Sequence, residues 1–433
     1  MNRLIYIVLS ILFFTSCDFL PSGTPVPVTD EEVCGLSFDP ATSERMVINA
    51  LDGATETVDV ALYGFNNDNI CGALIDAAER GVVVRCVTEY DSEYEGSWAR
   101  LIDESRVNEN VTITVKLGNA GGIMHNKYFI IDKAYIVTGS TNLTEGMAVH
   151  FNNMILIKSP SLAADFQRDF DIMYAGYFAG EKGGSVTNGF QDIFGKGKMW
   201  PETAHDIGRY TIQAYFTPYK QVFSSYRADD PVEYVYYSFE QGRIQSTADT
   251  SAGNYGNAMN VIFPLLDGAT ESIYIYSFAF TDKVIIDKLI KAHKRGVTVK
   301  VWMDYMMYRS GMSHSGRSII GLAKEIDNVR ICRDPDGGLL HHKVILIDGH
   351  TVILGSLNFS SNAVSNNDEN FLVIGNAGPI HDAFIGEAAR INEYSHVLRV
   401  MDDDFDEESG GEEDSESLSE LEEELENEEG VGL

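Results

Sequence analysis

Two short stretches of the chain carry a histidine and a lysine separated by one residue. They read HNKYFIIDKAYIVTGSTN at 125–142 and HHKVILIDGHTVILGSLN at 341–358. Both fit the spacing His-x-Lys, four residues, Asp, six residues, Gly-Ser-x-Asn. A histidine near neutral pH can act as a nucleophile or as a proton donor. A lysine two residues further along a strand shares its face and offers a positive charge to a phosphate oxygen. The pattern therefore predicts chemistry on a phosphate group.

The motif gives matching candidate residues in both stretches. We predict that its histidine, lysine and aspartate are catalytic, and that its serine and asparagine bind or orient the phosphate. The candidates are His125, Lys127, Asp132, Ser140 and Asn142 in the first stretch, and His341, Lys343, Asp348, Ser356 and Asn358 in the second. His342 aligns with Asn126 and points to the opposite face of the strand, so we do not expect it to be catalytic.

The motif belongs to a longer internal repeat. LDGATETVDVALYGF at 51–65 returns as LDGATESIYIYSFAF at 266–280, and RGVVVRCVTEY at 80–90 returns as RGVTVKVWMDY at 295–305. Both pairs are shifted by 215 residues, and the two motifs are shifted by 216. Three segments in one order at nearly one offset indicate a duplicated domain.

Each copy predicts an α/β domain. A helix around LDGATE precedes a buried strand, a second helix (70–80 and 285–295), a strand after Arg-Gly-Val, and a strand pair around the motif. This order predicts α/β/α layers with a mixed sheet in each half. A pseudo-twofold arrangement would gather two His, two Lys and two Asn around one phosphate in a single shared active site. One histidine would attack phosphorus while the other protonates the leaving oxygen. We expect a monomer with this internal pseudo-dimer.

The two motifs resemble the HKD signature of the phospholipase D superfamily, which both copies match at every position. The resemblance extends from about residue 35 to residue 400. It implies hydrolysis or transfer of a phosphodiester through a covalent phosphohistidine, without a metal or another cofactor. In many members with two motifs the nucleophile is the histidine of the first, here His125. The sequence also lacks a convincing cluster of metal ligands.

The halves differ after the Gly-Ser-x-Asn segment, where family members commonly carry an acidic residue. The second half supplies Glu369, whereas the first half has Asn152. A carboxylate orients a neighbouring histidine and stabilises its charged form, but an amide can only orient it. We therefore expect unequal roles for the two histidines. The sequence leaves open whether Glu369 pairs with His341 or reaches across to His125.

Five segments are predicted along the chain. They are a signal peptide (1–17), a first phospholipase D-like domain (35–175), a linker (176–209), a second such domain (210–400) with an insert at about 219–256, and an acidic disordered tail (401–433). The signal peptide ends in Phe-Thr-Ser-Cys, which resembles a bacterial lipobox. We expect acylation of Cys17 and a membrane-anchored lipoprotein in the periplasm or on the cell surface; a plain secretory signal is the alternative.

The cysteines leave the disulfide pattern open. Cys34, Cys71, Cys86 and Cys332 permit three pairings in an exported protein, and buried free thiols are equally compatible with the sequence.

The charge of the chain bears on its substrate. The tail after residue 401 holds 17 acidic and no basic residues, which leaves −16 of the formal −33 for the rest. Nucleic-acid binding requires dense Lys and Arg, so a nucleic-acid partner is not expected. We favour hydrolysis of a phospholipid headgroup bond by a membrane-bound phosphodiesterase. The alternatives are an exported nuclease, a phosphatidyltransferase of the cardiolipin synthase type, and a degenerate lipid-binding module.

Overall fold

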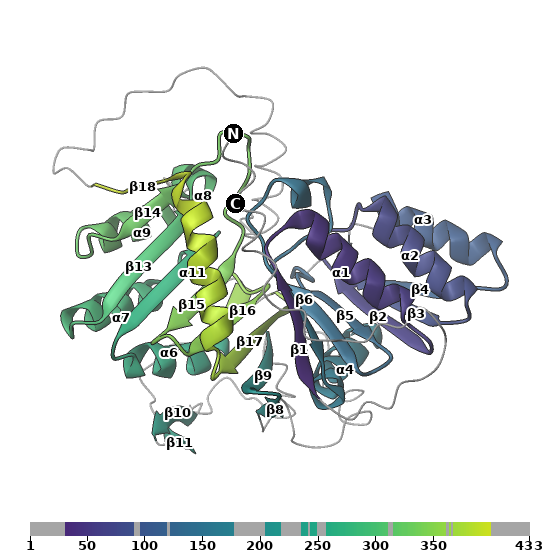
Figure 1. Ribbon diagram of the computed structural model, residues 1–433, viewed down its shortest axis with the longest axis horizontal. Helices are drawn as coiled ribbons and strands as arrows, with labels where there is room; N and C mark the ends of the chain where they lie inside the picture. Colours follow the sequence, from purple (N-terminus) through teal and green to yellow (C-terminus); the bar gives the residue numbers. More distant parts are fainter. Residues whose placement is uncertain are drawn as a thin grey trace, which may run out of the picture.

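Two mixed sheets, one from each half of the duplicated sequence, lie side by side in the computed structural model (Figure 1). The structure describes residues 31–90, 96–118, 122–176, 204–217, 235–240, 243–248, 257–310, 315–360, 363–364 and 367–399. The predicted signal peptide with Cys17, most of the predicted linker and insert, and the acidic tail lie outside these residues.

The first sheet has seven strands in the order β1-β7-β6-β5-β2-β3-β4. β2, β3 and β4 run parallel, and β5, β6, β7 and β1 are added as antiparallel neighbours. The strands are β1 (Glu32–Ser37), β2 (Thr57–Leu62), β3 (Val83–Thr88), β4 (Thr112–Leu117), β5 (Lys127–Ile131), β6 (Tyr135–Gly139) and β7 (Met154–Lys158).

The second sheet repeats this order with one extra strand at each edge. Its order is β18-β14-β13-β12-β15-β16-β17-β9-β8, in which β14 to β9 correspond to β4 to β1 of the first sheet. The strands are β8 (His205–Ile207), β9 (Tyr210–Thr217), β12 (Ser272–Ser277), β13 (Thr298–Asp304), β14 (Val329–Cys332), β15 (Lys343–Ile347), β16 (Thr351–Gly355), β17 (Glu369–Gly375) and β18 (Ser395–Val397). The predicted duplicated α/β fold with mixed sheets is therefore confirmed.

One strand departs from the predicted segments, and one hairpin lies apart from both large sheets. β8 lies inside the predicted linker, yet it pairs with β9 and belongs to the second sheet. A separate antiparallel hairpin of β10 (Val235–Glu240) and β11 (Arg243–Ala248) lies in the predicted insert.

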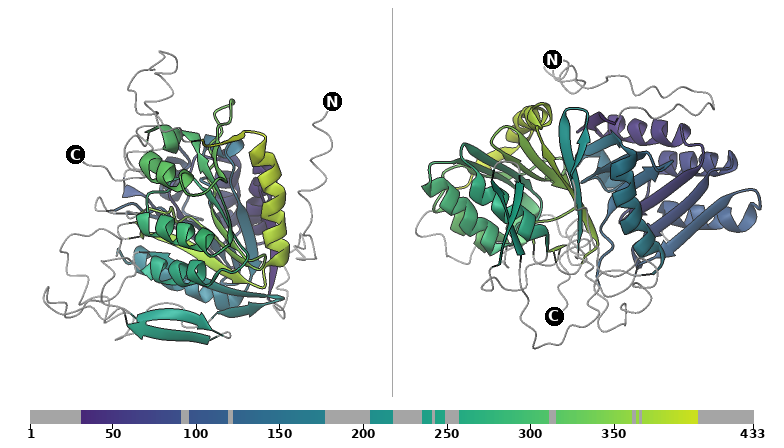
Figure 2. Two further views of the ribbon diagram at one scale, coloured as in Figure 1. Left: turned by 90° about the vertical axis from the view of Figure 1, so that its left-hand side faces the viewer. Right: turned by 90° about the horizontal axis from the view of Figure 1, so that it is seen from below.

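Helices cover the sheets, as the view from below shows (Figure 2). They are α1 (Pro40–Asp52), α2 (Asp68–Glu79), α3 (Gly96–Val107), α4 (Pro160–Tyr174), α6 (Asn257–Gly268), α7 (Lys283–Lys294), α8 (Tyr305–Ser310), α9 (Ser315–Ala323) and α11 (Gly378–Asn392), with a 3-10 turn η3 (Glu145–Ala148). Polar side chains cap several N-termini: Asp39 before α1, Asn67 before α2, Ser159 before α4 and Asp282 before α7. α1 and α6 end within the LDGAT stretches, so these stretches form the turn into the next strand.

The central apolar core joins the two halves. Phe166 of α4 and Phe384 of α11 belong to the same buried cluster as Ile130 of β5 and Leu346 of β15. Two further clusters lie beneath α1 and α2 and beneath α6 and α7. Because both faces of β5 and β15 are covered, every residue of these strands is buried. The strands that follow the two histidines are therefore held rigidly.

Three of the four cysteines considered for disulfides are not bonded to one another. Cys71, Cys86 and Cys332 are buried free thiols, so none of the three possible sets of two disulfides among the four cysteines forms. Burial raises the pKa of Cys332 to about 12, which makes its thiol unreactive. Within the described part of the chain, no helix is long and apolar enough to cross a membrane.

Candidate active site

Each histidine of the motif is bound through its backbone to the other half of the molecule. The His125 N–H donates to the Asp368 carbonyl at 2.9 Å, and the His341 N–H donates to the Phe151 carbonyl at 3.1 Å. Asp368 and Phe151 occupy equivalent places just before β17 and β7. The reciprocal bonds bring the segments ahead of β5 and β15 together. The expected shared site with pseudo-twofold symmetry is thus present in the backbone.

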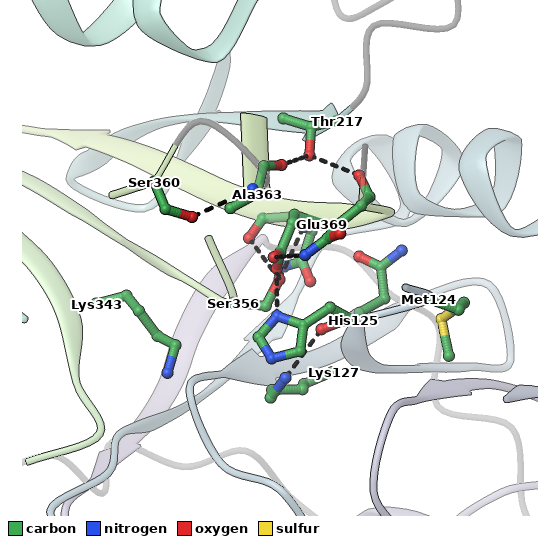
Figure 3. A network of polar contacts seen from close by, with 12 residues as sticks. Met124, His125, Lys127, Thr217, Lys343, Ser356, Ser360, Ala363 and Glu369 are labelled. Carbon is green, nitrogen blue, oxygen red and sulfur yellow. Dashed lines mark hydrogen bonds and ion pairs between the residues drawn. The ribbon is translucent and has the colours of Figure 1, made fainter. Parts of the chain in front are cut away.

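Glu369 crosses the interface to His125. Its Oε2 lies 2.7 Å from His125 Nδ1, and both side chains are fully buried (Figure 3). Ser356 donates to the same oxygen at 2.6 Å, while its own oxygen accepts the Asn370 N–H. Because an ionised carboxylate only accepts hydrogen bonds, Nδ1 carries the proton. Nε2 is then the ring nitrogen that Glu369 does not hold.

Asn152 plays the matching part for His341. Its Oδ1 lies 2.9 Å from His341 Nδ1 and also accepts from Ser140 at 2.9 Å. Ser140 in turn accepts the Asn153 N–H at 3.0 Å, so its proton points to Asn152. His341 Nδ1 therefore donates to an amide where His125 Nδ1 donates to a carboxylate. The question left open by the sequence is answered: each orienting residue belongs to the opposite half.

The two lysines have the same backbone contact. Lys127 Nζ donates to the His125 carbonyl at 2.9 Å, and Lys343 Nζ donates to the His341 carbonyl at 3.1 Å. Figure 3 shows Lys343 extending from the second half into the region of His125 and Lys127. All four side chains of the two His–Lys pairs are at most 3% exposed. Two ammonium groups in so dry a site attract a phosphate much more strongly than they would in water.

The structure does not bring Asp132 and Asp348 to the histidines. Each follows the last residue of a five-residue strand that begins with the motif lysine, about 16 Å away at a rise of 3.3 Å per residue. The Asp132 carboxylate accepts three backbone N–H groups, of Thr55, Glu56 and Thr57, at 2.8 to 2.9 Å.

The Asp348 carboxylate makes the equivalent bonds. It accepts the N–H groups of Thr270, Glu271 and Ser272 at 2.8 to 2.9 Å. Asp132 and Asp348 both have a φ near +50°, a strained conformation that Asp tolerates better than most residues. Our prediction that they are catalytic is therefore corrected to a structural role. We had predicted a catalytic role because both residues belong to the motif, but their carboxylates hold the backbone of residues 55–57 and 270–272.

His342 and Asn126 face away from the site, as the alternation of side chains along a strand predicted. His342 is fully buried, with Asn153 Nδ2 3.0 Å from its Nδ1 and Glu387 Oε1 3.4 Å from its Nε2. Burial lowers the pKa of His342, so it is neutral near pH 7. Asn126 lies 3.4 Å from Asp169 of α4. Both residues tie the motif strand to its covering helix.

Asn142 and Asn358 occupy the last position of each motif. The Oδ1 atom of each is buried and has no hydrogen-bond partner among the described residues. A buried polar group in this state commonly marks a place where a ligand completes the hydrogen bonding. Oδ1 needs a donor, whereas a phosphate oxygen is itself an acceptor, so only the Nδ2 groups of these amides can donate to a phosphate. The phosphate-binding role of Asn142 and Asn358 therefore stays a prediction.

Two acidic residues that the sequence analysis did not single out hold the segments ahead of the histidines. Glu89 Oε2 accepts the Met124 N–H at 2.5 Å, and Asp304 Oδ2 accepts the Leu340 N–H at 2.8 Å. Burial raises the pKa of Asp304 to about 6, against the effect of its backbone N–H donors and of Lys343. The pair is visible in the repeat, because TEY at 88–90 aligns with MDY at 303–305.

Comparison with known proteins decides the family. Residues 47–174 and 262–391, one range in each half, match the family described as "Cardiolipin synthase, PLD-like domain", and together they make up more than half of the chain. The chain belongs to this family of phospholipase D-like domains. The resemblance inferred from the two motifs is confirmed at the level of the superfamily.

Individual relatives match one part of the chain. "Phospholipase D" of Rickettsia bellii is 38% identical over 112 residues, which are 26% of this chain and 53% of the relative. "Mitochondrial cardiolipin hydrolase" of Chlamydomonas reinhardtii is 29% identical over 143 residues, which are 33% of this chain and 61% of the relative. The matches thus span only about half to three fifths of these relatives' lengths.

One solved structure shares the whole duplicated fold. Phosphatidylserine synthase of Haemophilus influenzae superimposes with a TM-score of 0.58 over 87% of this chain and 88% of its own, at 12% identity. At this identity the likeness concerns the fold alone. Among the described residues, no three His, Cys, Asp or Glu side chains lie together as a metal-binding group.

Proposed function

We propose that this phospholipase D-like protein is a phosphodiesterase that hydrolyses the headgroup bond of a phospholipid. The observation that carries the proposal is the assembly of two buried His–Lys pairs, each with its histidine oriented by the opposite half. This arrangement supplies a nucleophile, a proton donor and two positive charges around one phosphate.

The proposed reaction has two steps. In the first, His125 Nε2 attacks phosphorus, an N–P bond forms, and the bond from phosphorus to the headgroup oxygen breaks as His341 donates its Nε2 proton to that oxygen. In the second, water attacks phosphorus, His341 takes a proton from the water, and the N–P bond breaks. The products are a phosphatidate and the headgroup alcohol.

The unequal partners of the two histidines support this assignment. Glu369 places a negative charge against His125 Nδ1, which offsets the positive charge that the ring gains when Nε2 binds phosphorus. Asn152 offers His341 a neutral amide, which favours release of the His341 proton. The carboxylate of Glu369 therefore lies against the proposed nucleophile, His125, and the amide of Asn152 lies against the proposed acid, His341.

The substrate proposal draws on charge and on relatives. The body of the chain carries a formal charge of −16, which disfavours a polyanionic nucleic acid. Two relatives are named phospholipase D and cardiolipin hydrolase. We propose a phospholipid as the physiological substrate.

A substrate panel tests the proposed function. Purified protein is incubated with phospholipid vesicles, single-stranded DNA and an activated aryl phosphodiester, each with and without EDTA. We expect headgroup release from lipids well above any cleavage of DNA, and the same rates in EDTA. Faster cleavage of DNA than of phospholipid at physiological salt would contradict the proposed phospholipid substrate and indicate a nuclease. Loss of activity in EDTA would contradict the proposed metal-free mechanism.

The family description gives a transferase as the second candidate. An alcohol that replaces water in the second step would receive the phosphatidyl group, which is the reaction type of a cardiolipin synthase. Adding a short alcohol during lipid turnover separates the candidates. A hydrolase releases mainly phosphatidate, and a transferase gives mainly the phosphatidyl alcohol.

We also propose that the mature protein begins at an acylated Cys17 and is held on a membrane surface of the periplasm or the cell exterior. The Phe-Thr-Ser-Cys sequence supports the acylation of Cys17, because it resembles a lipobox. Two or more acyl chains on this residue would hold the protein stably on a membrane. Mass spectrometry of the mature N-terminus tests it. An unmodified N-terminus at any residue would refute the proposal.

A further inference from the structure

An aromatic ring stands beside each His–Lys pair at the same place in the repeat. Tyr63 follows the last residue of β2, and Phe278 follows the last residue of β12. They are the thirteenth residues of the duplicated stretches at 51–65 and 266–280. Neither residue belongs to the HKD motif, and neither was among our predicted site residues.

The contacts of the two rings are nearly the same. The Tyr63 ring centroid lies 5.1 Å from that of His125 at an interplanar angle of 61°, and Lys127 Nζ lies 5.3 Å from the Tyr63 centroid. The Phe278 ring lies 5.0 Å from that of His341 at 62°, and Lys343 Nζ lies 5.1 Å from its centroid. Two copies that have diverged elsewhere thus keep one geometry.

This geometry restricts two side chains at once. An edge-to-face contact defines the tilt of the histidine ring, whose Nδ1 is already held by Glu369 or Asn152. The negative face of the aromatic ring attracts the ammonium group, which also donates to the histidine carbonyl. Lysine is a long side chain with many rotamers, so two contacts at its tip reduce its freedom considerably.

We propose that Tyr63 and Phe278 are positioning residues that set the direction of Lys127 and Lys343 and the tilt of His125 and His341 for attack on the phosphate. The inference rests on the proposed function, whose His–Lys pairs it concerns. The ring carries the role, because Phe278 has no hydroxyl group and keeps the same contacts. Tyr63 is the better position to test, because it is partly exposed whereas Phe278 is 3% exposed.

The test compares Tyr63→Leu with Tyr63→Phe. Leucine keeps apolar volume but has no aromatic face, and phenylalanine keeps the ring. We expect Tyr63→Leu to lower kcat by about 10- to 100-fold, in line with the cost of misplaced catalytic groups, and to change KM little. Tyr63→Phe should keep most of the wild-type kcat. Equal melting temperatures of the two variants would show that loss of the fold is not the cause.

The Phe278→Leu variant adds a second comparison. His341 is the proposed proton donor, and a leaving group of low pKa departs without a donated proton. We therefore expect a larger loss on lipid than on the activated aryl phosphodiester. Tyr63→Leu, which affects the nucleophile, should slow both substrates alike.

If the wild-type protein turns over none of the substrates, the proposed function is refuted. The positioning role of Tyr63 is then tested by an NMR measurement that does not depend on activity. The ε-methylene protons of Lys127, assigned with Lys127→Arg, should be shifted upfield by the Tyr63 ring. The shift should persist in Tyr63→Phe and vanish in Tyr63→Leu. Wild-type kcat in Tyr63→Leu, an equal loss in Tyr63→Phe, or no ring-dependent shift would each overturn the positioning role.

Discussion

At the scale of single residues, the two halves differ most in what faces Nδ1 of each histidine. The repeat makes His125 and His341 look equivalent, but Glu369 gives one a carboxylate and Asn152 gives the other an amide. The surrounding bonds are otherwise alike, since Ser356 and Ser140 both donate to the orienting oxygen. One exchanged residue therefore gives the two duplicated histidines different partners, which is the basis of the unequal roles that we propose.

Replacing Glu369 with Gln tests this difference. The Gln amide oxygen can still accept from His125 Nδ1 and Ser356, but the negative charge is lost. We expect kcat to fall about 10- to 100-fold, by analogy with residues that orient metal-bound histidines. Because Glu369 supports the nucleophile, the loss should be alike on lipid and on the activated aryl phosphodiester. Unchanged kcat in a folded Glu369→Gln protein would contradict this role.

At the scale of elements, the strands that begin with the two lysines are fastened at both ends. The segment ahead of β15 is held by Asp304, and the turn after it is held by Asp348. β5 has the same two fasteners in Glu89 and Asp132. The four acidic residues thus position the motif histidines and lysines through hydrogen bonds to the backbone.

Replacing Asp348 with Ala should lower stability much more than catalysis. Losing its hydrogen bonds should cost about 1–2 kcal/mol, after allowance for partial exposure. Activity per folded molecule should fall far less than in His341→Ala, because Asp348 lies at the far end of β15. Thermal melting and active-site titration measure the two effects. A stable but inactive Asp348→Ala protein would indicate a catalytic role for Asp348 and contradict the structural one.

The stability difference should depend on pH. Partial burial acts to raise the pKa of Asp348, but three backbone N–H donors outweigh it and hold the pKa below the ordinary 3.8. A carboxyl with a lowered folded pKa stabilises the fold above its unfolded pKa and loses this contribution as pH falls through the folded value. The melting temperatures of wild type and Asp348→Ala should therefore converge below about pH 3.8. A constant difference from pH 7 down to the acid transition would contradict this.

How much of the site the sequence predicts depends on whether the information is local. The repeat predicts the succession of helices and strands along each half and the shared face of His125 and Lys127, because both follow from spacing along one segment. The partner of Glu369 depends on how two halves dock, and a sequence separation of 244 residues does not reveal it. Tyr63 and Phe278 were present in the aligned repeat, but an aromatic residue at a strand end usually belongs to the core.

At the scale of the whole molecule, further polar contacts join the two halves. Asn153 of the first half lies 3.0 Å from Nδ1 of His342, and Asn370 of the second half donates to Thr138 at 2.7 Å. His205 of β8 lies 2.6 Å from Asp165 of α4, and this hydrogen bond raises the pKa of His205. The dimer-like interface therefore contains titratable groups as well as the central apolar core.

His342→Asn should make the stability less sensitive to acid. Burial lowers the folded pKa of His342 below 6.5, so as pH falls below 6.5 the unfolded chain takes up the proton first and stability decreases. Asparagine cannot titrate, and it is the residue found at the equivalent position 126. Melting between pH 7.5 and 5 should show a smaller decrease for His342→Asn than for wild type. His205 is common to both proteins, so equal decreases would exclude His342 as the source.

The central claim, that His125 is the nucleophile and His341 is the acid, is tested most directly by locating the covalent intermediate. His341→Ala protein is mixed with the activated aryl phosphodiester, quenched in alkali to preserve phosphohistidine, and examined by intact-mass analysis and peptide mapping. We predict an adduct on His125 that persists, because the residue that activates water is missing, and no adduct in His125→Ala. An adduct on His341 in His125→Ala would contradict the account, as would turnover of the substrate by His125→Ala at the wild-type rate.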